Sequence, residues 1–225
     1  MIYGWSTMHS IETLDIKGYS NEAVPNTFFR QKAETKHLAI LLPGLGYTAH
    51  MPVMYYTGLA LLAKQADVMR ADYNYIKHSD FMALDPDERR RWAAKDAMAV
   101  FNAAIDQRKY DEITLVGKSI GTSAMGHLIA TIHDMPRLRC IWLTPLLKNE
   151  YLLSQIKQVE HRALFVVGTR DPYYDKAILE DLLKTTGGES IIITGADHSL
   201  EIDGDPVKAI QALERIVDGI LKFLK

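Results

Sequence analysis

The feature that most constrains the fold is a serine between two glycines, placed where a strand pattern gives way to a helix pattern. Residues 113–116 form a β-branched and aliphatic run typical of a buried strand. Apolar residues recur at helical spacing from Thr122 onward. Between them lies the sequence Gly-Lys-Ser-Ile-Gly at 117–121. Glycine at both ends lets a strand and a helix approach more closely than a Cβ permits, so the pattern predicts a sharp turn that lifts Ser119 clear of a sheet.

Gly117, Lys118 and Ser119 also match the end of a phosphate-binding P-loop. A P-loop has a further glycine five residues earlier, which helps free a run of backbone amides to surround the phosphate. Position 112 is glutamate, and residues 113–116 are strand formers. The sequence therefore excludes a phosphate-binding loop at this turn.

Strand and helix patterns alternate along the chain. Strand patterns occur at 11–18 and 25–31, which we interpret as an antiparallel hairpin, and at 37–42, 67–73, 113–116, 138–143, 163–167 and 190–194. Helix patterns occur at 53–66, 85–109, from 122, at 146–159, at 175–184 and from 205 onward, whereas 74–84 is irregular. This alternation predicts an α/β fold, a three-layer sandwich with a mostly parallel twisted sheet covered on both faces. No repeat or linker divides the sequence, so we expect a single domain over residues 1–225.

The composition argues against several classes of partner. A net charge of -2 gives no electrostatic basis for binding nucleic acid or an anionic membrane. No run approaches the ~18 apolar residues of a membrane span, and the first ten residues lack the basic start of a signal peptide. Cys140 is the only cysteine, which prevents an internal disulfide and suits the reducing cytoplasm. No pair of histidines with a carboxylate has metal-binding spacing, so we expect no metal and no cofactor.

Two further loops carry the residues that a reactive serine needs. A serine hydroxyl is a poor nucleophile until a base removes its proton, and a third group must hold that base in the correct tautomer. The strand pattern at 163–167 is followed by Asp171, and the one at 190–194 is followed by His198. Because parallel strands present their carboxyl ends at one edge of a sheet, we expect both side chains near Ser119. We assign His198 as general base and acid, and Asp171 as its orienting carboxylate.

Alternatives exist for both partners of the serine. Asp171 precedes a proline and could instead cap the following helix, in which case Asp175 is the substitute acid. His50 and His78 could also reach this edge of the sheet, although both precede the serine in the sequence.

The negative charge that develops during acyl transfer needs hydrogen-bond donors that are already in place. The first is expected to be the amide of Ile120, directly after the serine. The second is expected from the tight Pro-Gly-Leu-Gly loop at 43–46, after the strand pattern at 37–42. We choose the amide of Leu45, with Gly46 as the alternative.

These motifs, at 43–46, 117–121, 168–172 and 196–199, resemble those of the α/β-hydrolase superfamily over nearly the whole chain from about residue 37. The order serine, aspartate, histidine is also the order in that family. The resemblance implies serine-dependent hydrolysis, most often of esters. Many members carry histidine where this chain has Pro43. Because the expected donor is a backbone amide, this difference weakens the resemblance little.

A second departure concerns the lid. Many members insert a helical lid between the sixth and seventh strands, but only residues 145–161 lie in that interval here. One helix fits there and a lid domain does not. We therefore expect a small, lidless member whose site is open and is bordered by the loops at 46–51, 74–84 and 145–150.

The expected function is cleavage of a small carboxylic ester, a small-molecule substrate, through an acyl-enzyme intermediate. A thioesterase, an amide hydrolase or an acyltransferase would use the same parts, and a binding protein that keeps the fold without catalysis is the rival from another class. Tyr47, Tyr73 and Tyr173 lie at expected strand ends and could line an aromatic pocket. Lys118 could attract acidic substrates, but we favour a solvated or ion-paired lysine.

Overall fold

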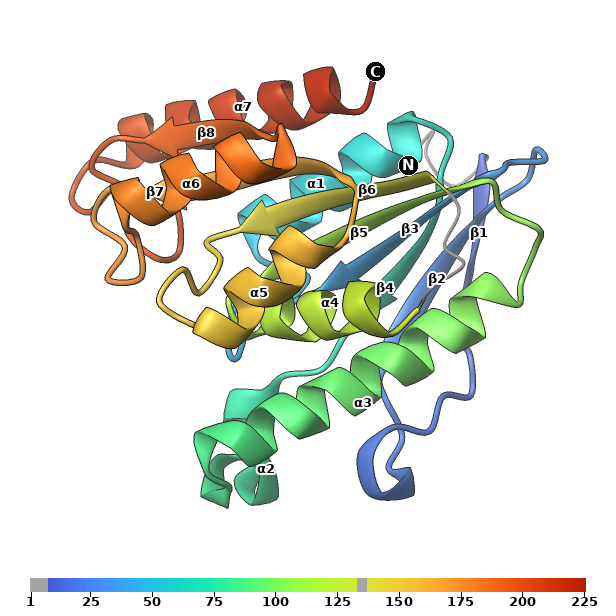
Figure 1. Cartoon of the computed structure of the whole chain (residues 1–225). Helices are drawn as coiled ribbons and strands as arrows, with labels where there is room; N and C mark the ends of the chain where they lie inside the picture. Colours follow the sequence, from blue (N-terminus) through green and yellow to red (C-terminus); the bar gives the residue numbers. More distant parts are fainter. Residues whose placement is uncertain (1–7, 133–136) are drawn as a thin grey trace.

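The computed structural model describes residues 8–132 and 137–225, and its middle layer is an eight-stranded sheet (Figure 1). The strands are β1 (His9–Glu12), β2 (Asn26–Gln31), β3 (His37–Leu42), β4 (Asp67–Ala71), β5 (Glu112–Lys118), β6 (Arg137–Leu143), β7 (Arg162–Gly168) and β8 (Glu189–Ile193). Their order across the sheet is β1-β2-β4-β3-β5-β6-β7-β8. β2 runs antiparallel to both of its neighbours, and every other neighbouring pair is parallel. The mostly parallel sheet expected from the sequence is confirmed.

Helices cover both faces of this sheet. They are α1 (Pro52–Ala63), α2 (Ser79–Ala83), α3 (Pro86–Ile105), α4 (Ile120–Thr131), α5 (Glu150–Gln158), α6 (Lys176–Thr186) and α7 (Pro206–Phe223), with 3-10 turns η2 (Tyr19–Asn21) and η3 (Tyr75–Lys77). α1 and α7 pack on one face, whereas α3, α4, α5 and α6 pack on the other (Figure 1). This arrangement is the three-layer sandwich that the alternating pattern predicts.

The central strand β3 shows why the sequence has an unbroken apolar run at 37–42. Leu38, Ile40 and Leu42 belong to the core beneath α3 and α4, and all three are fully buried. Ala39 and Leu41 belong to the second core, beneath α1 and α7. Side chains alternate between the two faces of a strand, so a strand covered on both faces must be apolar throughout.

The N-terminal hairpin differs in extent from the expectation. β1 and β2 do pair in antiparallel fashion, but β1 covers His9–Glu12 rather than 11–18. Beyond Glu12 the side chain of Asn26 replaces a strand partner: its Oδ1 accepts from Leu14 N at 3.0 Å, and its Nδ2 donates to Leu14 O at 2.9 Å. A side-chain amide thus satisfies the backbone where the ladder ends. Residues 1–7, including most of the segment considered for a signal peptide, lie outside the described part.

The stretch 74–84, expected to be irregular, contains η3 and α2. Tertiary contacts explain these two short helices. Tyr75 stacks on Phe81 with ring centroids 4.1 Å apart, and its hydroxyl donates to the buried carboxylate of Asp96 on α3 at 2.7 Å. His78 caps α2 by accepting from Phe81 N. Because Asp96 belongs to a distant segment, local sequence patterns do not predict this anchoring.

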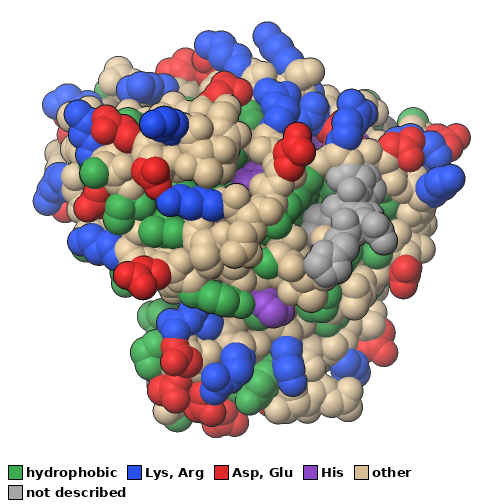
Figure 2. Space-filling view, in the orientation of Figure 1, with side chains coloured by type: hydrophobic (Ala, Val, Ile, Leu, Met, Phe, Trp, Pro, Cys, Tyr) green, Lys and Arg blue, Asp and Glu red, His purple; other side chains and the backbone are tan. Residues whose placement is uncertain are grey.

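The interval between β6 and β7 is described throughout and holds α5 alone, so no lid domain is inserted there. α5 begins at Glu150, four residues later than expected, because the side chain of Asn149 caps it. Within the described residues, no helix is both long and apolar enough to cross a membrane. Acidic and basic side chains are interspersed over the face shown in Figure 2, as the small net charge of -2 suggests.

Candidate active site

Ser119 lies between β5 and α4 in a backbone conformation that non-glycine residues rarely adopt, with φ 54° and ψ −119°. The turn is closed by Thr122, whose amide and hydroxyl both donate to Ser119 O, at 2.8 Å and 2.6 Å. Such a conformation costs on the order of 1–3 kcal/mol and persists only where surrounding contacts enforce it. The structure therefore has the strained strand-to-helix turn that the sequence predicts.

The two glycines of the turn are required by close backbone contacts. A Cβ on Gly117 would lie 2.7 Å from Gly121 O, and a Cβ on Gly121 would lie 2.1 Å from Leu42 O. Real Cβ atoms do not approach backbone oxygens so closely, and backbone atoms cannot move aside cheaply. Glycine at both positions is thus what allows α4 to start directly above β5 and β3.

The loop that carries His198 is held in shape by the side chain of Asp197. Oδ1 of Asp197 accepts from the amides of Ser199 at 2.8 Å and Glu201 at 3.1 Å, which folds the loop into a tight turn after β8. The same loop packs on the end of β7, where a Cβ on Gly168 would lie 2.3 Å from Ala196 O. This contact brings the residues after β7 and after β8 together.

Ser119, His198 and Asp171 form a continuous hydrogen-bonded chain. Ser119 Oγ lies 2.8 Å from His198 Nε2, and His198 Nδ1 lies 2.8 Å from Asp171 Oδ2. A carboxylate only accepts hydrogen bonds, so Nδ1 carries the proton and Nε2 is left free to accept from the serine hydroxyl. The Asp171 side chain is 2% exposed and the His198 side chain 30%. The hydrogen-bonded chain thus runs from a buried carboxylate to a partly exposed imidazole beside Ser119.

The choice between the two aspartates is made by their contacts. Asp171 Oδ1 accepts from the amide of Tyr173 at 2.8 Å, which fixes the carboxylate that faces His198. Asp175 instead caps α6, where its Oδ1 accepts from Ile178 N at 3.1 Å. The helix cap that the sequence allowed for Asp171 is therefore supplied by Asp175.

Three backbone amides near the serine donate no hydrogen bond within the part of the chain that the structure describes. Ile120 is the first residue of α4, and the leading amides of a helix have no intrahelical acceptor. The loop at 43–46 approaches the serine closely, since a Cβ on Gly44 would lie 3.4 Å from Ser119 Cβ. Within the described residues, the amides of Ile120, Leu45 and Gly46 donate no hydrogen bond, whereas that of Gly44 donates to Tyr47 O at 3.0 Å. Both Leu45 and Gly46 thus remain available as the second donor.

Lys118 differs from the expectation of a solvated or ion-paired side chain. It is only 1% exposed, and among the described residues it forms no salt bridge. Its Nζ donates to Thr144 Oγ1 at 2.7 Å and to the backbone oxygen of His198 at 2.6 Å. It also lies 4.5 Å from the centre of the Tyr47 ring. Because β5 is central and covered on both faces, its last side chain points into the protein and not into water.

The three tyrosines considered for a pocket occupy different environments. Tyr73 is 4% exposed and stacks on Tyr75 with ring centroids 4.1 Å apart, so it is a core residue, and the cavity that it lines contains neither Ser119 nor His198. Tyr47 is half-buried between Lys118 and α1, and its hydroxyl accepts from Val53 N at 3.1 Å. Only Tyr173 is exposed at the site, with its ring centroid 5.3 Å from that of His198.

Thr144 is a site residue that the sequence analysis missed. It follows β6 directly, is fully buried, and has a positive φ of 41° although it is β-branched. It accepts the hydrogen bond from Lys118 described above. The rule that selected Asp171 and His198, a polar residue just past the carboxyl end of a strand, also applies to Thr144.

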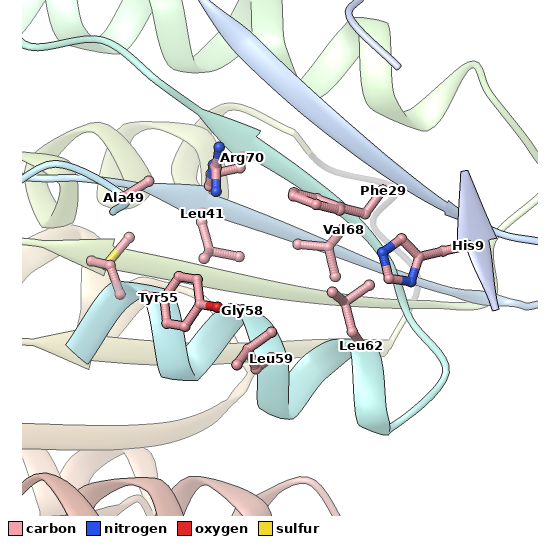
Figure 3. Close-up of a pocket in the computed structure, with 11 residues that line it drawn as sticks. His9, Phe29, Leu41, Ala49, Tyr55, Gly58, Leu59, Leu62, Val68 and Arg70 are labelled. Atoms are coloured by element: carbon pink, nitrogen blue, oxygen red, sulfur yellow. The ribbon is translucent and has the colours of Figure 1, made fainter. Parts of the chain in front are cut away.

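An apolar cavity of about 400 Å³ lies elsewhere, between α1 and the strands β1, β2, β3 and β4 (Figure 3). Phe29, Leu41 and Val68 line its sheet side, and Tyr55 and Gly58 line its helix side. Its lining contains neither Ser119 nor His198, so it is separate from the hydrogen-bonded chain. Among the residues that the structure describes, no group of three or more metal-binding side chains is placed to hold an ion.

Several solved structures have a similar fold. The dienelactone hydrolase of Anabaena variabilis matches with a TM-score of 0.72 at 15% identity, over 96% of this chain and 97% of that one. The Pyrococcus furiosus esterase Pf2001 matches with a TM-score of 0.69 at 12% identity, over 96% and 92%. A serine hydrolase without a lid from Xanthomonas campestris matches with a TM-score of 0.66 at 18% identity, over 96% and 95%. At such low identities these likenesses establish the fold alone.

Sequence comparison gives the family. No curated protein matches the chain. The family described as "Alpha/beta hydrolase domain" matches residues 35–225, which include β3 to β8, the Ser119 turn and the loops of Asp171 and His198. This chain therefore belongs to the alpha/beta hydrolase domain family.

Proposed function

We propose that this protein is a serine hydrolase that cleaves a small carboxylic ester. The observation that carries the proposal is the hydrogen-bonded chain from Ser119 through His198 to Asp171, with both distances at 2.8 Å. A serine held in a strained turn, a histidine in the accepting tautomer and a buried carboxylate are the parts that nucleophilic acyl transfer needs. The similar folds of an esterase and a dienelactone hydrolase support an ester as the substrate.

The geometry supports the following sequence of steps. Ser119 Oγ attacks the acyl carbon while His198 Nε2 accepts the hydroxyl proton, and Asp171 stabilises the imidazolium that forms. The carbonyl oxygen becomes an oxyanion held by the amides of Ile120 and Leu45. The C–O bond to the alcohol breaks as His198 returns the proton to it, which leaves an acyl group on Ser119. His198 then takes a proton from water as the water oxygen bonds to the acyl carbon. The bond from that carbon to Ser119 Oγ breaks, His198 returns the proton to Oγ, and the acid is released.

The site is suited to small substrates that enter from solvent. No lid domain is inserted between β6 and β7, and the His198 side chain is 30% exposed. Tyr173 is the aromatic side chain beside this histidine, and we assign it to the substrate pocket.

Hydrolysis of p-nitrophenyl esters of increasing acyl length tests the proposal. We expect wild-type turnover with short acyl chains and a fall in kcat of about 10⁴-fold or more for Ser119→Ala. The matched control is Ser154→Ala, an exposed serine on α5 whose hydroxyl bonds Tyr151 O. Melting temperatures of all three proteins show whether each is folded.

A fluorophosphonate, which labels activated serines, separates a wrong substrate from a wrong function. Labelling of the wild type but not of Ser119→Ala, without ester turnover, would favour a thioesterase or acyltransferase that uses the same serine. A folded wild type that neither turns over esters nor becomes labelled would overturn the proposal in favour of a binding protein.

A further inference from the structure

The ammonium of Lys118 occupies an unusual position for a charged group. It lies at the end of β5, beside Ser119, with the whole residue 1% exposed. Its Nζ donates to the hydroxyl of Thr144 at 2.7 Å and to the main-chain carbonyl of His198 at 2.6 Å, and it lies 4.5 Å from the centre of the Tyr47 ring, within the range of a cation–π contact. Among the described residues, no carboxylate lies within 4.0 Å of it. Two hydrogen bonds and an aromatic ring thus surround the charge, without a contacting counter-ion.

Packing alone does not explain this arrangement. Burying an ammonium without a paired anion costs free energy, and an apolar side chain of similar length would fill the same space without that cost. The acceptors come from three separate segments, after β3, after β6 and after β8. Lys118 therefore joins the loop that carries His198 to the framework beneath Ser119.

The contact with His198 is the informative one. The imidazole is held at its two nitrogens, by Asp171 and by Ser119. The backbone of the same residue is held by Lys118 through the carbonyl oxygen. With ring and backbone both fixed, the imidazole has little freedom to rotate away from Ser119.

We propose that Lys118 is a positioning residue. Held in place by Thr144 and Tyr47, its ammonium donates a hydrogen bond to the main-chain carbonyl of His198 and so keeps the imidazole in line with Ser119. The inference rests on the function proposed above. Lys118 touches neither the reacting serine hydroxyl nor Asp171 directly in the structure, so it acts through His198.

The charge on Lys118 makes this role sensitive to pH. Burial lowers the pKa of Lys118 from 10.5 to about 8, although Asp171, Asp197 and Glu201 oppose the shift. A hydrogen bond from an ammonium is roughly twice as strong as one from a neutral amine. The hydrogen bond to the His198 carbonyl is therefore at full strength well below pH 8 and weakens as the pH rises through that value. Tyr47, with a pKa raised to about 12 by burial, keeps its proton throughout this range.

Kinetics of Lys118→Met on p-nitrophenyl esters test the proposal, because methionine keeps the length of the side chain and removes all three donors. We expect kcat to fall about 10- to 100-fold while KM changes less than about 3-fold, since the substrate pocket is intact. The matched control is Lys184→Met, an exposed lysine in the last turn of α6, which should keep wild-type kinetics.

Thr144, which accepts a hydrogen bond from Lys118, gives a second pair of variants. Thr144→Ser retains the hydroxyl and should retain wild-type kcat, whereas Thr144→Val removes the acceptor and should lower kcat in the same direction as Lys118→Met. In the double variant, Thr144→Val should add little to the loss, because the two residues act through one contact.

The pH profile separates positioning from a purely structural role. Wild-type kcat/KM should fall as the pH rises through about 8, and this alkaline decline should be absent in Lys118→Met. Wild-type kcat in folded Lys118→Met, or equal kcat in Thr144→Val and Thr144→Ser if the lysine variant does not fold, would overturn the inference and leave the proposed function standing. An inert, unlabelled wild type would instead overturn the function itself.

Discussion

At the scale of single residues, the site combines strained backbone conformations with a buried charge. Ser119 has a φ of 54° and Thr144 a φ of 41°, and neither is glycine. Lys118, between them in space, keeps a charge in the interior. Each of these features costs free energy, and all three converge on the position of one imidazole. Strained backbone conformations and buried charges, which lower the stability of a fold, are common at functional sites.

The two candidate aspartates give opposite outcomes on substitution. Asp171→Asn should lower kcat by about 10⁴-fold with little loss of stability, because an amide in this position favours the wrong tautomer of His198. Asp175→Ala should keep kcat and lower the free energy of unfolding by about 1 kcal/mol, because it removes the cap of α6. Ester kinetics and urea unfolding of both variants check this assignment. Loss of activity in Asp175→Ala alone would reverse it.

Lys118 also makes stability depend on pH in a direction opposite to activity. Its pKa is about 8 in the folded protein and 10.5 ordinarily, so between these values the unfolded chain binds more protons than the folded one. The free energy of unfolding of the wild type, relative to Lys118→Met, should therefore rise from pH 8 to 10.5, by at most about 3 kcal/mol. Urea unfolding of the two proteins across this range measures the difference. A difference that stays constant with pH would show that the lysine does not titrate there.

At the scale of elements, the site depends on loops that follow parallel strands. β5, β7 and β8 run parallel, so the residues after each strand emerge at one edge of the sheet (Figure 1). Gly168 then allows the last two loops to touch, since any Cβ there would meet the backbone of Ala196. The hydrogen bond between Ser119 and His198 joins residues 79 positions apart in this way.

Helix α1 offers a test of the separate apolar cavity. Gly58 lies in the middle of α1, lines that cavity, and would place a Cβ 3.4 Å from Leu41 Cδ2, an ordinary contact (Figure 3). Gly58→Ala should raise the free energy of unfolding by about 1 kcal/mol, through helix propensity and partial filling of the cavity. Ester kinetics should stay unchanged because the cavity is separate from Ser119.

The matched control lies in another helix. Gly219→Ala in α7 makes the same chemical change, but its Cβ would lie 2.3 Å from Ile191 Cδ1, so the clash should cancel or reverse the gain. Thermal or urea unfolding compares the two variants. Equal stabilisation by both would show that local packing does not decide the outcome.

At the scale of the whole molecule, the fold places Ser119 near the centre of the sheet. β5 has four strands on one side of it and three on the other, and helices cover both faces. The hydrophobic cores on both faces thus support the turn at Ser119. The site lies at the carboxyl ends of the parallel strands, where no domain inserted between β6 and β7 covers it.

Local patterns in the sequence predict the layered fold, the sharp turn at Ser119 and the polar loops that follow the strands. Strand and helix periodicity, glycines beside Ser119 and polar residues after strands are local features that the chain displays before it folds. Boundaries were less well predicted, as at β1 and α5, because Asn26 and Asn149 end or begin elements through side-chain contacts.

The environments of the site residues depend on the tertiary fold. It buried Lys118 against a carbonyl 80 positions away, placed Tyr73 in the core, selected Asp171 over Asp175 as the partner of His198, and added Thr144. The physical reason is the same in each case. Burial and hydrogen-bond partners depend on segments that meet only when the sheet assembles, and no local pattern of residues encodes which segments those are.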